Sequence, residues 1–409
     1  MSDFRQYLFP PDHPRLAEVR GMDPYAYREH ARTPGTFTGG LVEGWTPLYR
    51  QPFRGITEDG VLRGDLYPLE PARPGEEAPV AAMVTAAEAL LAAADDPRLQ
   101  YPVDSSEWQT WANPEFLQFD TGLRLEFQPA EVRQAALALV AASLSSAGFA
   151  QVQLMMRING FLGEVVGLPT VLGEFSYNLA LYGEPDLRAP WGWQLYGHHC
   201  AVNCLVVEGR MVVSPVFLGA EPDAIDEGPH TSPRAFAGRI AEWRAVMAAM
   251  TPGQRSAATV YAEMVDPAMP PGRVHPGDER HLDGAFQDNR VIPVEGVRVA
   301  DLPAAAQDAA RAVAATAVGL LPDGPWAARL REIDEHWADT TFSWIGGHGP
   351  DDVFYARLQS PVVIAELDHH CGVFLDYRTP QPFHVHTVLR TPHGNDYGRA
   401  WVRRIQERS

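Results

Sequence analysis

The sequence of 409 residues contains no lysine, so arginine supplies every basic side chain other than histidine. Schiff-base enzymes and covalent pyridoxal phosphate enzymes depend on a lysine amine, and the phosphate-binding P-loop contains an essential lysine. The missing lysine therefore excludes these three mechanisms. Cysteine is scarce as well, with Cys200, Cys204 and Cys371 alone. This odd, small number argues against a disulfide framework and favours a reducing compartment.

Long apolar runs are also missing. No stretch of about 18 apolar residues occurs, and the N-terminus lacks the apolar segment of a signal peptide. We therefore expect a soluble, cytoplasmic protein without a membrane partner. Acidic residues outnumber basic ones by 52 to 33, which gives a net charge of −19. So acidic a surface repels nucleic acid, and a small-molecule substrate is the expected partner.

Several catalytic signatures are absent from the sequence. It has no GxSxG elbow, no HExxH helix, no CxxC pair and no GxGxxG after a strand. These absences argue against serine hydrolases, zincins, thioredoxin-like proteins and dinucleotide-dependent dehydrogenases.

Helical and strand patterns occur in separate blocks of the chain. Residues 1–75 contain many proline, glycine and aromatic residues with little periodicity, which predicts an extended N-terminal arm. Residues 76–409 are expected to form a single elaborated domain. Its predicted Ala-rich helices cover residues 79–94, 129–148, 151–166, 303–320 and 325–337.

The strand patterns alternate with period two and are rich in β-branched and aromatic residues. They cover residues 175–182, 193–207 and 211–213, and then a closely spaced series at 341–344, 353–358, 362–368, 373–377 and 383–390. Short strands at such spacing predict an antiparallel meander. Blocks of helices that alternate with blocks of strands indicate an α+β fold with mainly antiparallel sheet.

The last predicted strand carries two histidines on one face. His384, His386, Val388 and Arg390 share that face because side chains alternate along a strand. Two imidazoles at this spacing can reach one metal ion, and Glu366 on a neighbouring strand would complete a His/His/carboxylate set. The alternative is the solvated polar face of a half-exposed sheet.

A second histidine pair, His198-His199, lies inside the aromatic stretch predicted as a strand. Adjacent strand residues face opposite ways, so only one of the two is expected to be a ligand unless Gly197 marks a bulge. Cys200 and Cys204 share the face of His198 and are alternative soft ligands or small core residues. Arg390 has the planar fork that binds a substrate carboxylate, although it could instead pair with Asp396 or Glu366.

Together these segments resemble a bacterial and fungal family known as a domain of unknown function. The shared motifs are Gly-His-His at 197–199, Pro-x-Phe-x-Gly-Ala-x-Pro at 215–222 and His-x-His-x-x-x-Arg at 384–390. The resemblance extends from about Trp108 to Tyr397 and implies no particular reaction. It implies that the functional set comprises His198, His199, Glu366, His384, His386 and Arg390.

From these residues we expect a metal-dependent enzyme with one transition metal ion. The metal ligands would be His198, His199, Glu366, His384 and His386, with Glu366, Arg390 and Tyr196 in catalytic or substrate-binding roles. A histidine-rich set favours iron or copper and the O₂-using oxidation of a small molecule. An acidic molecule is one option for this substrate. The alternatives are a zinc-dependent hydrolase with Glu366 as general base, and a non-catalytic protein that binds a metal or a small ligand.

Overall fold

One large sheet organises the computed structural model, which describes residues 4–10 and 12–408. Its strands are β1 (Gln100–Tyr101), β2 (Leu123–Arg124), β3 (Tyr177–Tyr182), β4 (Trp191–Gly197), β5 (Cys200–Val207), β6 (Arg210–Ala220), β7 (Thr259–Tyr261), β8 (Val297–Arg298), β9 (Thr341–Gly346), β10 (Phe354–Gln359), β11 (Ile364–His369) and β12 (Val385–Arg390). The main path runs β1-β3-β4-β5-β6-β12-β11-β10-β9-β7. All strand pairs are antiparallel apart from β1–β3 and β7–β9. The predicted α+β fold with mainly antiparallel sheet is therefore confirmed.

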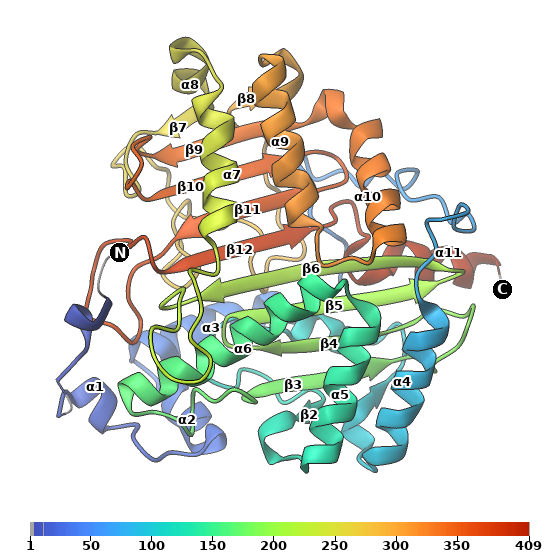
Figure 1. The fold of residues 1–409 in the computed structure, drawn as a ribbon, viewed down its shortest axis with the longest axis vertical. Coiled ribbons are helices and arrows are strands. Elements are labelled where there is room, and N and C mark those ends of the chain that lie inside the picture. Colours follow the sequence, from blue (N-terminus) through green and yellow to red (C-terminus); the bar gives the residue numbers. More distant parts are fainter. Residues whose placement is uncertain (1–3, 11, 409) are drawn as a thin grey trace.

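Helices lie on both faces of this sheet, most of them on the face toward the viewer in Figure 1. They are α1 (Pro14–Ala17), α2 (Pro24–Ala31), α3 (Phe37–Tyr49), α4 (Val80–Ala93), α5 (Ala130–Ser143), α6 (Ser146–Val166), α7 (Ala237–Ala248), α8 (Pro252–Ala258), α9 (Ala304–Ala317), α10 (Asp323–Glu335) and α11 (Arg399–Arg408). Figure 1 shows α6 crossing the first meander, β3–β6, while α7 and α9 cross the second meander, β9–β12. None of the described helices is both long and apolar enough to cross a membrane.

Capping residues set the helix boundaries more sharply than composition does. The helix expected over residues 129–148 ends at Ser143, because Ser145 begins α6 as its N-cap and accepts a hydrogen bond from the Gly148 amide at 3.0 Å. At α8, Thr251 and Gln254 form the reciprocal capping box that their spacing indicates. Local hydrogen bonds of this kind end one helix and start the next within two residues.

The N-terminal segment differs from the extended arm expected for residues 1–75. It contains α1, α2 and α3, and α3 lies behind the sheet, on the face opposite α6 and α7 (Figure 1). In α3, Trp45 and Tyr49 are four residues apart and share one side of the helix. Trp45 stacks on Phe116 and Phe286, with ring centroids 6.3 and 5.0 Å apart. This aromatic contact holds the segment against the rear of the sheet.

The two central meanders meet where β6 pairs with β12. In this register His386 lies opposite Gly219, and on the other side of β12 it lies opposite Asp368 of β11. Directly opposed residues point to the same face, so His386 and Asp368 both point away from α7 and α9. Thr387, the next residue, faces the helices and accepts a hydrogen bond from Arg239 of α7. The rear face of the central strands is therefore the polar one.

Candidate metal centre

Three histidine rings converge on the rear face at the junction of β6 and β12. The Nε2 atom of His386 lies 3.0 Å from the Nε2 atom of His384 and 3.0 Å from that of His199. All three side chains are buried. Three buried imidazole nitrogens that face one another can bind a transition metal ion. The His-x-His pattern thus marks two members of a real spatial cluster, and His199 supplies the third.

His198 and His199 form the two-residue turn between β4 and β5, because Gly197 pairs with Cys200. The prediction of one continuous strand over residues 193–207 is therefore wrong. A turn releases the pair from strand alternation, and both rings face the same side, stacked with centroids 3.8 Å apart. His199 adopts a φ of 61°, a left-handed conformation that is strained for a residue with a side chain.

A hydrogen-bond chain fixes the proton on His384. The Tyr377 hydroxyl donates to Glu221 at 2.6 Å, and His384 Nδ1 lies 3.0 Å from the same hydroxyl oxygen. When Glu221 is ionised, the hydroxyl proton is committed to it, so Nδ1 donates to the hydroxyl oxygen and Nε2 keeps its lone pair. Burial raises the pKa of Glu221 to about 7, and hydrogen bonds from Tyr377 and two backbone amides oppose that shift.

His198 is fixed in the same tautomer by a different partner. Asn159 donates through Nδ2 to the Gly173 carbonyl at 2.8 Å, so its Oδ1 atom faces His198 Nδ1, 2.8 Å away. The ring therefore donates through Nδ1 and exposes the Nε2 lone pair. Burial lowers the pKa of His198 to about 3, which keeps the ring neutral. His198 stacks on His199, but it belongs to none of the three potential ligand sets of the described residues.

Glu366 is buried, but its oxygens are already occupied by donors. It accepts hydrogen bonds from His281 Nδ1 at 2.9 Å, from the Leu282 amide at 3.0 Å and from the Tyr355 hydroxyl at 2.5 Å. Arg357 lies 3.9 Å away. Burial alone would raise the pKa of Glu366, but the hydrogen bond from His281 and the charge of Arg357 hold it well below its ordinary value. The structure places Glu366 as the carboxylate that orients His281, away from the three converging rings.

His281 and Asp283 were missed in the sequence, where they lie in a long segment without periodicity. Two further sets of side chains have ligand atoms within 4.8 Å of one another. One contains His281, His370 and His386, and the other contains His281, Asp283 and Glu366. His281 and Asp283 are recognised only because the fold brings them close to Glu366 and His386, and no local sequence pattern reports that proximity.

Arg390 and Tyr196 do not line the large cavity that is bordered by the histidines. The Arg390 guanidinium is fully buried and pairs with Asp288 and, at 2.9 Å, with Asp396. Arg390 therefore makes the alternative pairing with Asp396 and is not free to bind a substrate carboxylate. The Tyr196 hydroxyl is held by the backbone carbonyl and amide of Thr121, both at 3.2 Å. Both side chains join peripheral segments to the sheet.

Two of the three cysteines do not contribute to the histidine cluster. Cys200 and Cys204 are fully buried among apolar residues of β5, and neither joins any of the potential metal-binding sets. Burial raises the pKa of Cys200 to about 12, so its thiol stays protonated at neutral pH. Cys200 and Cys204 are therefore small core residues and not soft metal ligands.

A cavity of about 810 Å³ opens in front of the histidine cluster. It is lined by His198, His199, His370, His384 and His386. Residues of α2, α3 and the segments 113–116 and 276–286 also line it, and they include the stacked rings of Trp45, Phe116 and Phe286. This volume is in the range of small-molecule sites, and its wall combines apolar rings with a few convergent polar groups.

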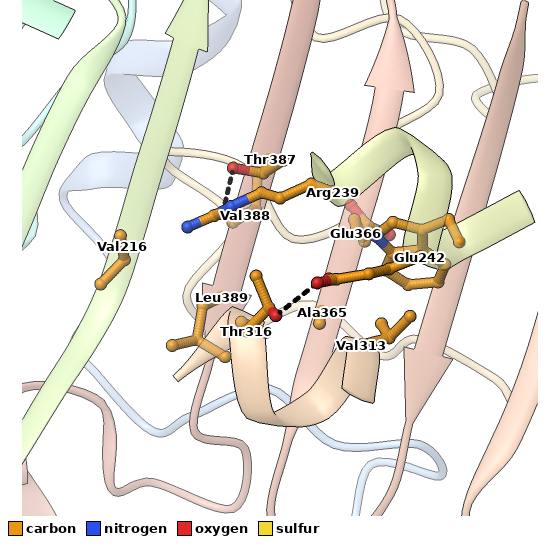
Figure 2. Close-up of a pocket in the computed structure, with 12 residues that line it drawn as sticks. Val216, Arg239, Glu242, Val313, Thr316, Ala365, Glu366, Thr387, Val388 and Leu389 are labelled. Carbon is orange, nitrogen blue, oxygen red and sulfur yellow. Dashed lines mark hydrogen bonds between the residues drawn. The ribbon is translucent and has the colours of Figure 1, made fainter. Parts of the chain in front are cut away.

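A much smaller void lies on the opposite face of β11 and β12. Figure 2 shows Arg239 reaching Thr387 and Glu242 reaching Thr316 around it. Its volume of about 20 Å³ holds roughly one water molecule. The void is a packing defect under α7 and α9, far smaller than the histidine-lined cavity of about 810 Å³.

The types of donor atom bear on which class of metal ion could bind. Neutral imidazoles with few carboxylates suit a transition metal better than Mg²⁺ or Ca²⁺. The separations of 3.0 Å between the nitrogens are also the length of an N–H···N hydrogen bond, so they select no coordination geometry.

Comparison with known proteins identifies the family. No curated protein and no solved structure matches the chain. A family model described as a protein of unknown function, DUF3500, matches residues 76–399. This match covers most of the chain, including the turn with His199, the motif at 215–222 and the strand with His386. The chain therefore belongs to the DUF3500 family.

Proposed function

We propose that the protein is a metal-dependent oxidoreductase that binds one transition metal ion, iron or copper, through His199, His384 and His386. The observation that carries this proposal is the convergence of three buried Nε2 atoms, with His386 Nε2 at 3.0 Å from both others. The tautomer of His384 supports it further, because Tyr377 and Glu221 hold the proton on Nδ1. Bound iron or copper would supply one-electron and O₂ chemistry.

The substrate proposed for this centre is a small molecule with a flat apolar part. The aromatic rings of Trp45, Phe116 and Phe286 line the same cavity as the histidines. Stacking on such rings orients a planar group. An acidic group on the substrate would meet Arg15 and Arg378, exposed arginines that line the same cavity.

A zinc-dependent hydrolase is the second candidate, and Asp278 is the observation that favours it. This side chain lines the cavity, is nearly fully buried, and its Oδ2 atom makes no hydrogen bond. Burial raises the pKa of Asp278 above its ordinary value, as expected for a carboxylate poised to accept a proton from water. Asp278 would then take the role of general base that the sequence suggested for Glu366.

Elemental analysis of protein purified without a histidine tag or chelator tests the proposal. Wild type is compared with a His199→Gly/His384→Ala double variant, in which glycine suits the left-handed φ at position 199. The exposed His230 provides a matched control, His230→Ala. Stoichiometric iron or copper that is lost only in the double variant supports the proposal and leads to oxygen-consumption assays.

The other outcomes are equally informative. Zinc lost in the double variant would favour the hydrolase, and hydrolysis that depends on Asp278 would then be assayed with Asp278→Asn. Metal absent from all three proteins, even after incubation with Fe²⁺, Cu²⁺ and Zn²⁺ in turn, would show that the converging rings hold no ion and would refute the proposal.

A further inference from the structure

A second set of buried nitrogens adjoins the proposed ion. His281, His370 and His386 present ligand atoms within 4.8 Å of one another, and all three side chains are buried. The His370 ring centroid lies 3.8 Å from that of His386 and 5.4 Å from that of His281. His386 is therefore a member of both histidine sets, while the other members differ.

The orientation of the His386 ring separates its two nitrogens. Its Cδ2–Nε2 edge faces β6, because a Cβ atom built on Gly219 would lie 2.7 Å from Cδ2 and 3.3 Å from Nε2. Nε2 is also the atom that approaches His199 and His384. The Nδ1 atom lies on the opposite edge of the ring, toward β11, where Asp368 is the register partner of His386. This Nδ1 atom is buried and makes no hydrogen bond.

The other two members of the second set have nitrogens available on that side. His281 donates through Nδ1 to Glu366 at 2.9 Å, and its buried Nε2 atom has no hydrogen-bond partner. A histidine whose Nδ1 proton is held by a carboxylate is the usual state of a metal ligand. His370 Nε2 lies 3.2 Å from Asp368 Oδ2, at ion-pair distance but without the geometry of a hydrogen bond.

We propose that His386 bridges two metal ions, with Nε2 bound to the ion of His199 and His384 and Nδ1 bound to a second ion held by His281 and His370. This inference rests on the proposed function for the first ion and adds a second ion to it. Because the bridge uses both ring lone pairs, the remaining N–H proton of His386 leaves to solvent when the second ion binds. Next to the second site, Glu366 holds the Nδ1 proton of His281, and Asp368 is paired with Arg280 at 2.7 Å.

The set of His281, Asp283 and Glu366 is the competing position for a second ion. Glu366 already accepts hydrogen bonds from His281, Leu282 and Tyr355, so its oxygens are less available than the free nitrogens of the histidine set. Both oxygens of the buried Asp283 are without a hydrogen bond, which keeps this position open as an outcome of the test.

Copper stoichiometry and electron paramagnetic resonance together test the bridge. After equilibrium dialysis with Cu²⁺, we expect two ions per chain in wild type and in His230→Ala. One ion should remain in His199→Gly/His384→Ala, and one in His281→Ala/His370→Ala. Two Cu²⁺ ions joined by an imidazole ring couple magnetically, so the wild-type signal should integrate to far less than its copper content, while each double variant should give its full spin count.

Each contrary result points to a different error. One wild-type ion that depends on His199 and His384 alone would refute the second ion and leave the proposed function intact. One ion that depends on His281 and His370 alone would refute the proposed first site. A second ion that is lost in Asp283→Asn but kept in His370→Ala belongs to the carboxylate set, and two uncoupled ions are not bridged; either result refutes the bridge. If His281→Ala/His370→Ala does not fold by circular dichroism, the glutamine substitutions at both positions replace it.

Discussion

Replacing Gly219 by alanine should damage the histidine centre while every proposed ligand stays in place. The new Cβ would lie 2.7 Å from His386 Cδ2 and 3.3 Å from His199 Cδ2. Ordinary carbon–carbon contacts are about 3.5–4.0 Å, so the His386 ring would have to retreat by about 1 Å. Gly219 is not among the glycines with a positive φ, so alanine brings no backbone strain of its own. The whole effect therefore comes from the clash with the two rings.

Such overpacking costs about 1–3 kcal/mol of folding free energy. A ligand displaced by about 1 Å exceeds the tolerance of about 0.2 Å in metal–ligand bonds, so we expect metal affinity to fall by about tenfold or more. Competition with a chromophoric chelator measures the affinity, and urea unfolding in excess chelator measures the stability of the metal-free protein.

Gly238→Ala is the matched control, because Gly238 is exposed in α7 and a Cβ there meets nothing within 4 Å. Alanine at this helix position should stabilise by about 0.5–1 kcal/mol and leave metal binding unchanged. Wild-type affinity and unchanged stability in Gly219→Ala would show that the rings do not converge beside β6, and the proposed centre would then lose its basis.

Three further substitutions test buried polar groups. Tyr377→Phe removes the partner that fixes the His384 proton, so metal affinity should fall by about 10–100-fold in the chelator assay with the fold unchanged; unaltered affinity would contradict the tautomer assignment. Arg390→Met leaves the buried Asp396 unpaired and should lower the free energy of unfolding by about 3–5 kcal/mol, while metal content per folded chain stays constant; a change in metal content alone would point to a direct role. Burial raises the pKa of Asp223 from 3.8 to about 6, so the folded state retains a proton that the unfolded state loses, and this group lowers stability as pH rises from about 4 to 6. Asp223→Asn should remove that decline, about 1.4 kcal/mol per pH unit at most, in urea unfolding followed across this range, and an unchanged slope would assign the decline to other groups.

The alternation of side chains along the strands predicted which residues share the polar face of the sheet. His386 and Glu366 were both placed on one face of an antiparallel meander, and they lie on the rear face of β12 and β11. Alternation could not show that Glu366 is already occupied by donors. Its hydrogen bond to His281 joins residues 85 positions apart in the chain, and no local pattern reports such a contact.

The turn at His198-His199 shows a second limit of sequence patterns. Two-residue hairpin turns usually contain glycine, asparagine or aspartate where φ is positive. Here His199 occupies the left-handed position with a φ of 61°, so the usual turn signal is missing and the segment looks like one strand. The pairing of β4, β5 and β6 imposes the turn on a sequence that does not favour it. Strain at this point is consistent with a functional demand on His199.

The motif at residues 215–222 illustrates how a family pattern can be understood once the rings are in view. Phe217 packs edge-on against His386, with centroids 5.0 Å apart. Gly219 leaves space for the same ring, and Glu221 binds Tyr377 behind His384. Phe217 and Gly219 of β6 and the following Glu221 therefore position His384 and His386. The motif carries no ligand itself, which is why its chemistry was not evident from its residue types.

The free nitrogens of the cluster also predict how the fold responds to metal removal. His281 Nε2 and His386 Nδ1 are buried without partners, and each such atom costs about 1–3 kcal/mol in the metal-free protein. An ion that binds only the folded state relieves this cost and adds about 2.7 kcal/mol of stability when its free concentration is 100 times its dissociation constant. A chelator should therefore lower the unfolding midpoint of wild type.

His386→Ala should abolish this chelator effect, because His386 belongs to both histidine sets. The exposed-histidine variant His230→Ala should respond as wild type does. If chelator and added metal leave the unfolding midpoint of wild type unchanged, the buried nitrogens are not satisfied by an ion. The cluster would then be a network of neutral imidazoles, in which His386 Nε2–H can donate to only one of its two neighbours at a time.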